Sequence, residues 1–108
     1  MIWAEAAKKY LAAFAAKDEK TLREMYSDRV ELIDGYSHLN GVEDVVAGNA
    51  AVWMFVEQIS IRIQNTCYRD KYICIEYVLL LDASKANMMT AIEFDDFGKI
   101  KSVRTYKQ

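Results

Sequence analysis

The residue patterns of this chain change kind about halfway along its length, and that change restricts the fold more than any single motif does. Up to about residue 56 the apolar residues recur mostly at helical spacing, apart from one alternating stretch at residues 28–34. From residue 59 onward the pattern is alternating or continuously apolar, which is typical of strands. Helices gathered early and strands gathered late predict an α+β fold, in which three N-terminal helices pack on a curved, mostly antiparallel sheet.

Two helices are expected before the first strand. Residues 3–16 are rich in alanine and carry an apolar stripe at helical spacing, which includes Tyr10 and Phe14. Residues 17 and 18 interrupt this pattern. Asp18 is an N-cap residue type and predicts a second, short helix that ends at residue 25 or 26.

A third helix is expected after a polar loop at residues 35–38. Asn40, followed three residues later by Glu43, resembles a capping box, and the helix it opens is predicted to end near Val56. In the run 72–81 both the odd-numbered and the even-numbered positions are mostly apolar, so we predict a central strand covered on both faces. The other late strands are expected around residues 59–63, at 87–95 and at 100–107, the last two joined by a turn at 96–99.

Composition indicates one ordinary globular domain spanning residues 1–108. Apolar residues make up 53% and charged residues 28% of the chain, and its net charge is −2 with both signs interspersed. This balance predicts no nucleic-acid partner and no attraction to an anionic membrane surface. The first residues lack the order of a signal peptide, and no run reaches the roughly 18 apolar residues that a spanning helix needs. We therefore expect a cytoplasmic protein.

The two cysteines, Cys67 and Cys74, do not form a metal-binding pattern, because His38 is the one histidine of the chain. A two-residue turn at residues 70 and 71 would place the two cysteines opposite each other across a hairpin, whereas a three-residue turn would offset them. In a reducing compartment, two small buried thiols are expected. No metal and no cofactor is predicted.

Asp34 is an acid at a position where a hydrophobic residue is expected. It continues the face formed by Val30 and Leu32 on the strand predicted at residues 28–34. A carboxylate that enters an apolar cavity becomes a stronger base, because desolvation disfavours its charged form. The alternative is that Asp34 closes the strand and caps the turn at Gly35.

Several segments together resemble the SnoaL-like and ketosteroid-isomerase-like group of the nuclear transport factor 2-like superfamily. They are the strand entry Tyr26-Ser27-Asp28-Arg29-Val30, the third helix starting at Gly41, and the terminal hairpin Phe94-Asp95-Asp96-Phe97-Gly98-Lys99-Ile100. The resemblance covers nearly the whole chain. It implies a cone-shaped α+β fold with a pocket at its open end, in a superfamily whose members include isomerases, cyclases, dehydratases and non-catalytic modules.

The resemblance also implies roles for individual residues. Asp34 falls where the ketosteroid isomerases hold their general base, and Tyr10 falls where they hold the tyrosine that donates to the enolate oxygen. Thr90 stands where that family has a protonated aspartic acid, so a hydroxyl replaces a stronger donor. Tyr10 has an alternative interpretation as a core tyrosine bonded to a backbone carbonyl.

Other residues are expected to line or border the pocket. They are Phe14, Leu32, His38, Asn49, Trp53, Glu76, Met88 and Thr90. For three of them the sequence leaves alternatives open: Asn49 as a surface amide, His38 as an exposed loop residue, and Glu76 in an ion pair with an arginine.

Two functions follow from these patterns. The first is an enzyme of the isomerase, cyclase or dehydratase type that acts on a small apolar carbonyl compound, with Asp34 as base and with Tyr10 and Thr90 as donors to the oxyanion. The second is a non-catalytic ligand-binding or dimerisation module, in which the outer face of the sheet pairs two copies into a homodimer.

Overall fold

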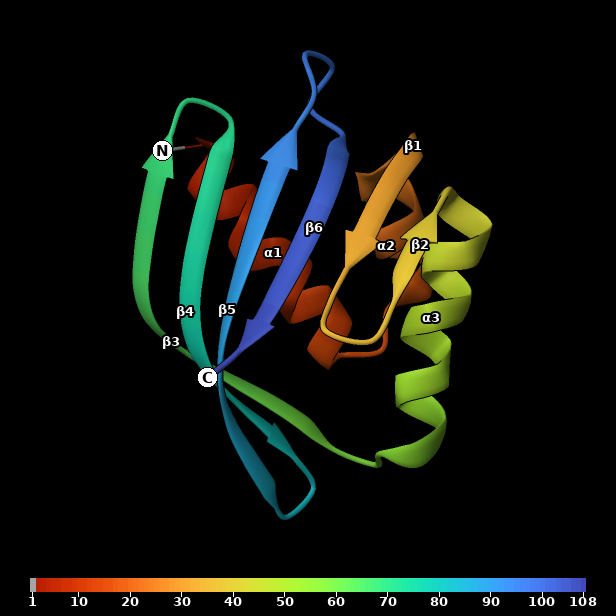
Figure 1. The fold of residues 1–108 in the computed structure, drawn as a ribbon, viewed down its shortest axis with the longest axis vertical. Helices are drawn as coiled ribbons and strands as arrows, with labels where there is room; N and C mark the ends of the chain where they lie inside the picture. The colour runs from red at the N-terminus through yellow and green to blue at the C-terminus, as the bar shows by residue number, and fades with distance from the viewer. Residues whose placement is uncertain (1) are drawn as a thin grey trace.

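Three helices and one six-stranded sheet make up the computed structural model, which describes residues 2–108 (Figure 1). The helices are α1 (Ile2–Ala15), α2 (Glu19–Met25) and α3 (Val42–Phe55). The strands are β1 (Tyr26–Ile33), β2 (His38–Asn40), β3 (Ile59–Arg69), β4 (Tyr72–Leu81), β5 (Ser84–Phe94) and β6 (Ile100–Lys107). The predicted α+β architecture is confirmed.

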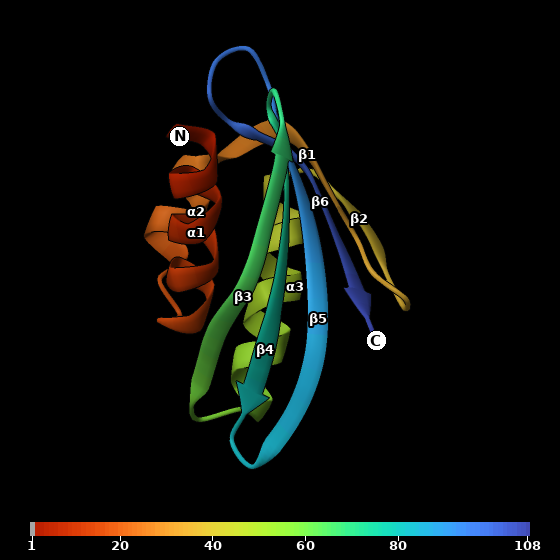
Figure 2. The ribbon, with the colours of Figure 1, turned by 90° about the vertical axis from the view of Figure 1, so that its left-hand side faces the viewer.

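The sheet has the strand order β2-β1-β6-β5-β4-β3, and every pairing is antiparallel except that of β1 with β6. Figure 2 shows α1 and α2 at the left and the strands of the sheet to the right of them, with the lower ends of the long strands bending toward the helices. We call the face toward the helices the inner face and the opposite one the outer face.

The core lies between the helices and the inner face. Alternate residues of the central strands point inward, and Ile73, Ile92 and Val103 lie side by side across β4, β5 and β6 with at most 1% of their surface exposed. Leu22 of α2 is fully buried against the same core. Within the described residues no helix covers the outer face, so the prediction that residues 72–81 are covered on both faces was wrong for this chain taken alone.

The start of α2 follows the predicted capping chemistry. Asp18 is the N-cap, and its Oδ1 accepts a hydrogen bond from the backbone N–H of Thr21 at 3.1 Å. Its Oδ2 accepts a second bond from the Thr21 hydroxyl at 2.7 Å. Because these bonds favour the carboxylate, they lower the pKa of Asp18, with the side-chain bond from Thr21 as the largest cause.

The start of α3 differs from the prediction. Asn40 is not a capping residue but the last residue of β2, where it pairs with Glu31 of β1. Gly41 is the N-cap, with φ 85° and ψ 158°, and no side chain caps this end. The Gly41 N–H still donates to the carbonyl of Val30 at 2.8 Å, as a strand residue would, while the next residue already belongs to α3. The chain makes this direct change from strand to helix through a positive φ, which glycine adopts without strain.

The short strand β2 was not expected, and β1 and β5 begin earlier than predicted, at Tyr26 and Ser84. The turn after β3 has two residues, because Arg69 pairs directly with Tyr72. The same register sets Cys67 opposite Cys74. Cys67 is exposed and Cys74 is half-buried, so the expectation of two buried thiols was wrong: β3 is an edge strand with a solvent-facing side.

None of the helices described in residues 2–108 is long and apolar enough to cross a membrane.

Replacing Gly41 with alanine is expected to lower the free energy of unfolding by about 1–3 kcal/mol, because a Cβ is strained in this region of φ and ψ. Urea unfolding followed by tryptophan fluorescence measures the change. Gly35→Ala is the matched control, since a Cβ at Gly35 meets open space and its φ is not positive. We expect the control to change stability by less than about 0.5 kcal/mol; equal losses in both variants would contradict this account.

Candidate functional site

A cavity of about 530 Å³ lies between α1, α3 and the inner face of the sheet. Most residues that line it are apolar, and the polar ones come from distant parts of the chain. Seven of the predicted site residues line this cavity: Tyr10, Phe14, Leu32, Asp34, Asn49, Met88 and Thr90. The fold therefore brings both proposed catalytic residues to the wall of one cavity.

Tyr10 and Tyr26 form one hydrogen-bonded chain with Asn49. The Asn49 side-chain amide donates to the Tyr26 hydroxyl at 2.7 Å, and the Tyr26 hydroxyl donates to the Tyr10 hydroxyl at 3.2 Å. The two tyrosine rings meet edge to face with centroids 5.9 Å apart. Because the Tyr10 oxygen accepts the bond from Tyr26, the Tyr10 proton is available for an acceptor in the cavity.

Burial determines the protonation of this chain. It raises the pKa of Tyr10 well above its usual value, and the neighbouring Tyr26 and Tyr77 add to the shift. Burial also raises the pKa of Tyr26, against the hydrogen bond that Asn49 donates to its oxygen, which lowers it. Both phenols stay neutral near neutral pH, so Tyr10 acts as a hydrogen-bond donor and not as a base.

A second group of hydroxyls lies around Thr90, which is 1% exposed. The Thr90 Oγ1 is 2.7 Å from the Tyr77 hydroxyl and 3.3 Å from the Thr105 Oγ1. All three residues line the cavity. Burial raises the pKa of Tyr77, so this group also stays neutral and can donate or accept hydrogen bonds.

Asp34 combines both interpretations that the sequence left open. It is half-buried in the cavity wall, where it continues the face of Val30 and Leu32 as expected. Its Oδ1 accepts the backbone N–H groups of Tyr36 and Ser37, each at 2.7 Å, so it also caps the turn after β1. Both of these bonds use Oδ1, and they hold the side chain in a fixed orientation.

Three predicted site residues do not line the cavity. His38 is exposed and pairs with Glu31, its Nε2 lying 2.7 Å from Oε2. The Trp53 indole N–H donates to the carbonyl of Phe14 at 3.1 Å and thereby ties α3 to α1. Glu76 lies on the outer face, where its Oε1 accepts from the amide of Asn65 at 3.3 Å instead of pairing with an arginine.

Sequence reasoning missed three polar residues of this region: Tyr26, Tyr77 and Thr105. Tyr26 was read only as the end of a helix or the start of a strand. Thr105 meets Thr90 because the two are partners in the β5–β6 register, and Tyr77 lies diagonally across from Thr90. Spacing along the sequence does not set these registers. The one sequence signal that could have found these residues was that Tyr77, Thr90 and Thr105 each occupy an inward-facing position on a strand.

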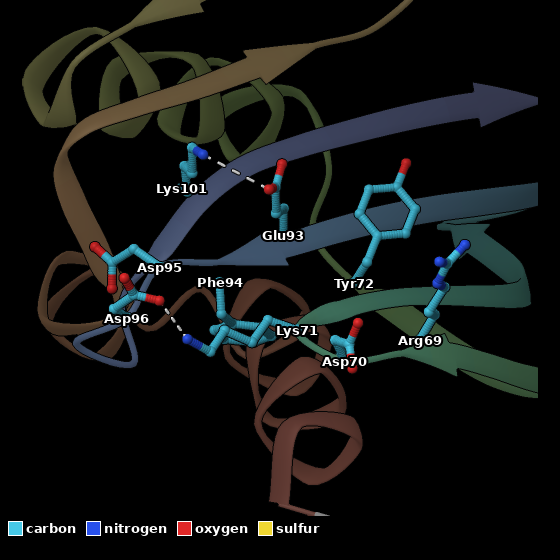
Figure 3. A pocket seen from close by; sticks show the side chains of 9 residues that line it. All are labelled: Arg69, Asp70, Lys71, Tyr72, Glu93, Phe94, Asp95, Asp96 and Lys101. Atoms are coloured by element: carbon cyan, nitrogen blue, oxygen red, sulfur yellow. Dashed lines mark hydrogen bonds and ion pairs between the residues drawn. The ribbon is translucent and has the colours of Figure 1, made fainter.

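A larger hollow, of about 730 Å³, lies at the opposite end of β4, around the two hairpin turns (Figure 3). Most of the residues that line it are charged, and four of these form two ion pairs. Figure 3 shows Lys71 directed at Asp96 and Lys101 directed at Glu93, the second pair at 3.6 Å. This hollow lacks the apolar lining expected of a small-molecule site, so we assign the candidate site to the smaller cavity.

Within residues 2–108, no group of three or more histidine, cysteine, aspartate or glutamate side chains is placed to hold a metal ion.

Comparison with solved structures places the fold. A proposed SnoaL-like polyketide cyclase from Shewanella denitrificans superposes with a TM-score of 0.87 over 99% of this chain and 90% of its own, at 15% identity. A proposed isomerase of the SnoaL-like family from Agrobacterium tumefaciens superposes with a TM-score of 0.85 over 100% of this chain and 99% of its own, at 15% identity. A protein with a ketosteroid isomerase-like fold from Catenulispora acidiphila was crystallised with trimethylamine. It superposes with a TM-score of 0.81 over 93% of this chain and 82% of its own, at 16% identity.

No family model matches the sequence, and no curated protein matches it. At these low identities the structural likeness shows the fold alone. The chain has the cone fold of the nuclear transport factor 2-like superfamily, in the form shared by SnoaL-like and ketosteroid-isomerase-like proteins.

Tyr10→Phe is expected to weaken the loss of stability at alkaline pH. The folded chain keeps the Tyr10 proton to a higher pH than the unfolded chain, so folding stability falls as pH rises above about 10. Without this hydroxyl the fall becomes shallower. Urea unfolding at stepped pH between about 8 and about 11 measures the slope. Tyr36→Phe, at a tyrosine that is 97% exposed, should leave the slope unchanged; a steeper fall in Tyr10→Phe would contradict the assignment.

Proposed function

We propose that this chain binds a small, largely apolar carbonyl compound in the cavity and catalyses a proton transfer of the isomerase, cyclase or dehydratase type. The observation that carries the proposal is that a carboxylate, Asp34, and a neutral phenol, Tyr10, line the same largely apolar cavity. An oriented base and a donor to the developing oxyanion are the two groups that enolisation requires.

The proposed reaction begins at Asp34. Its carboxylate takes a proton from the carbon next to the substrate carbonyl, and the electron pair of that C–H bond moves toward the carbonyl oxygen. Tyr10 donates a hydrogen bond to the enolate oxygen that forms, while Tyr26 donates to Tyr10 and strengthens it as a donor. Return of the proton from Asp34 to a second carbon completes an isomerisation without an oxidant or a cofactor.

Thr90 is the proposed second donor. Its hydroxyl already shares hydrogen bonds with Tyr77 and Thr105, so the three groups offer a polar end to a ligand whose remainder is apolar. A hydroxyl donates more weakly than the protonated carboxylic acid of the ketosteroid isomerases. We therefore propose a substrate whose proton is already acidic, such as a ketone activated by a second carbonyl group, over an unactivated ketone.

The alternative function is a non-catalytic pocket of the same fold. It is favoured by the two backbone N–H groups that donate to Asp34 Oδ1, because they commit one of the two carboxylate oxygens to capping the turn. On this alternative, ligands still bind in the cavity and no turnover follows.

The test uses Asp34→Asn, which keeps an oxygen for the turn and removes the base. A thermal-shift screen of small dicarbonyl and polyketide-like compounds on the wild type finds ligands, because a ligand at 100 times its dissociation constant stabilises by about 2.7 kcal/mol. For compounds that are turned over, Asp34→Asn is expected to lower kcat by about 10²–10⁴-fold. Tyr10→Phe is expected to lower it by about 10²–10³-fold.

Asp28→Asn is the matched control, since Asp28 is an exposed carboxylate on the same strand. It should leave both binding and turnover unchanged. Binding that is retained in Asp34→Asn, with no turnover of any bound compound by the wild type, would favour the non-catalytic alternative. No stabilisation by any compound would contradict both.

We also propose that the outer face of the sheet pairs two copies of the chain. It carries exposed apolar side chains at Tyr72 (41%), Leu80 (36%) and Tyr106 (50%). Arg104 lies on the same face as Glu76, so a twofold arrangement can set unlike charges against each other. A stable dimer would bury roughly 1,200–2,000 Å² in total on this surface.

Sedimentation velocity at micromolar concentration tests the pairing. We expect the wild type to sediment as a dimer and Tyr106→Arg to shift it toward a monomer, because an added charge would have to be buried without a partner. Tyr68→Arg is the control, since Tyr68 is a comparably exposed tyrosine (57%) of opposite parity on edge strand β3. A wild type that is monomeric at these concentrations would refute the proposed pairing.

A further inference from the structure

Cys67 and Cys74 are the two cysteines of the chain, and they face each other across the β3–β4 ladder. Directly opposed residues of an antiparallel pair have their Cα atoms about 4.5–5.5 Å apart and their side chains on the same face. A disulfide requires a Cα separation of about 4.4–6.8 Å. The register therefore places the two Cα atoms within the range that a disulfide requires.

The two thiols differ in access to solvent. Cys67 is exposed on β3, which is the edge strand of the sheet, whereas Cys74 is half-buried on β4. Burial raises the pKa of the Cys74 thiol, and the neighbouring Cys67 raises it further. An external reagent therefore meets Cys67 first, and Cys74 is available behind it as a second thiol.

Charged side chains of both signs lie around the pair. Arg69, which is exposed, follows Cys67 by two residues and lies on the same outer face. Arg104 of β6 pairs with Ala91 of β5, which in turn pairs with Cys74. Two carboxylates lie on the same face: Glu76 of β4, whose Oε1 accepts from the amide of Asn65, and Glu93 of β5, which pairs with Lys101.

We propose that Cys67 and Cys74 form a site of reversible thiol–disulfide exchange with a small disulfide of the glutathione type. The Cys67 thiolate attacks one sulfur of the disulfide, forms a mixed disulfide and releases one glutathione thiolate. The Cys74 thiolate then attacks the Cys67 sulfur and releases the second. The protein dithiol loses two electrons and two protons, and the oxidised glutathione is reduced to two thiols.

The consequence of the exchange is a covalent tie between edge strand β3 and the core strand β4. Both cysteines lie on the outer face, while the cavity opens on the inner face, so the exchange does not rest on the proposed enzymatic function. It requires Cys67, on edge strand β3, to lie outside the area that the proposed dimer buries. Its test is correspondingly independent of any substrate.

The experiment uses the full chain in buffers of defined ratio of oxidised to reduced glutathione, quenched with acid and analysed by intact mass. The mass of the single wild-type chain is expected to fall by two hydrogen atoms, with no disulfide-linked dimer, and trypsin should leave peptides 63–69 and 72–85 joined. Cys74→Ser should accumulate one stable glutathione adduct, because it lacks the second thiol. Cys67→Ser should react at least about tenfold more slowly, since its remaining thiol is half-buried.

The equilibrium gives a second readout. If the fold aligns the thiols, the ratio of disulfide to dithiol at a given glutathione ratio should be about tenfold higher for the native chain than in guanidinium chloride, equivalent to about 30 mV. A wild type that accumulates the mixed disulfide, as Cys74→Ser does, would overturn the proposal. So would a native chain that forms the disulfide no more readily than the unfolded one.

Discussion

The parallel pairing of β1 with β6 joins the helical half of the chain to its strand half, and the site depends on it. Leu32 pairs with Val103 and Ile33 with Arg104, about seventy positions apart in sequence. This pairing sets the inner face of β1 against α3 and carries Asp34 to the rim of the cavity. Without it, the acid at the end of β1 would be an ordinary strand end in solvent.

The cavity contains more hydrogen-bonding groups than its apolar lining suggests. There are two separate clusters, one ending at Tyr10 and one centred on Thr90. Within each cluster the side chains hydrogen-bond to one another. Each hydroxyl that already accepts a bond from a neighbour keeps its own proton for a further acceptor. The protein thus keeps polar groups in its interior without leaving a buried charge.

Local chemistry accounts for the parts of the fold that were predicted correctly. The helical stripe of α1, the Asp18 cap and the inward parity of Leu32 and Asp34 each depend on residues within a few positions of one another. The errors have a different origin. Asn40 was assigned as a cap because its pairing with β1 cannot be read from spacing, and Cys67 was expected to be buried because edge strands look like central ones in a single sequence.

The sequence by itself determined the α+β class, the three helices and every strand except β2, because periodicity is a local property. It made Asp34 a candidate through its place on an apolar face, and the family resemblance added Tyr10. Only the tertiary structure decided which polar groups contact each other. Tyr26 and Asn49 form a hydrogen-bonded chain with Tyr10, and Tyr77 and Thr105 lie within hydrogen-bond distance of Thr90. It also decided that three predicted site residues, His38, Trp53 and Glu76, do not line the cavity. The physical reason is that these relations are set by strand register and helix packing, which depend on contacts between distant residues.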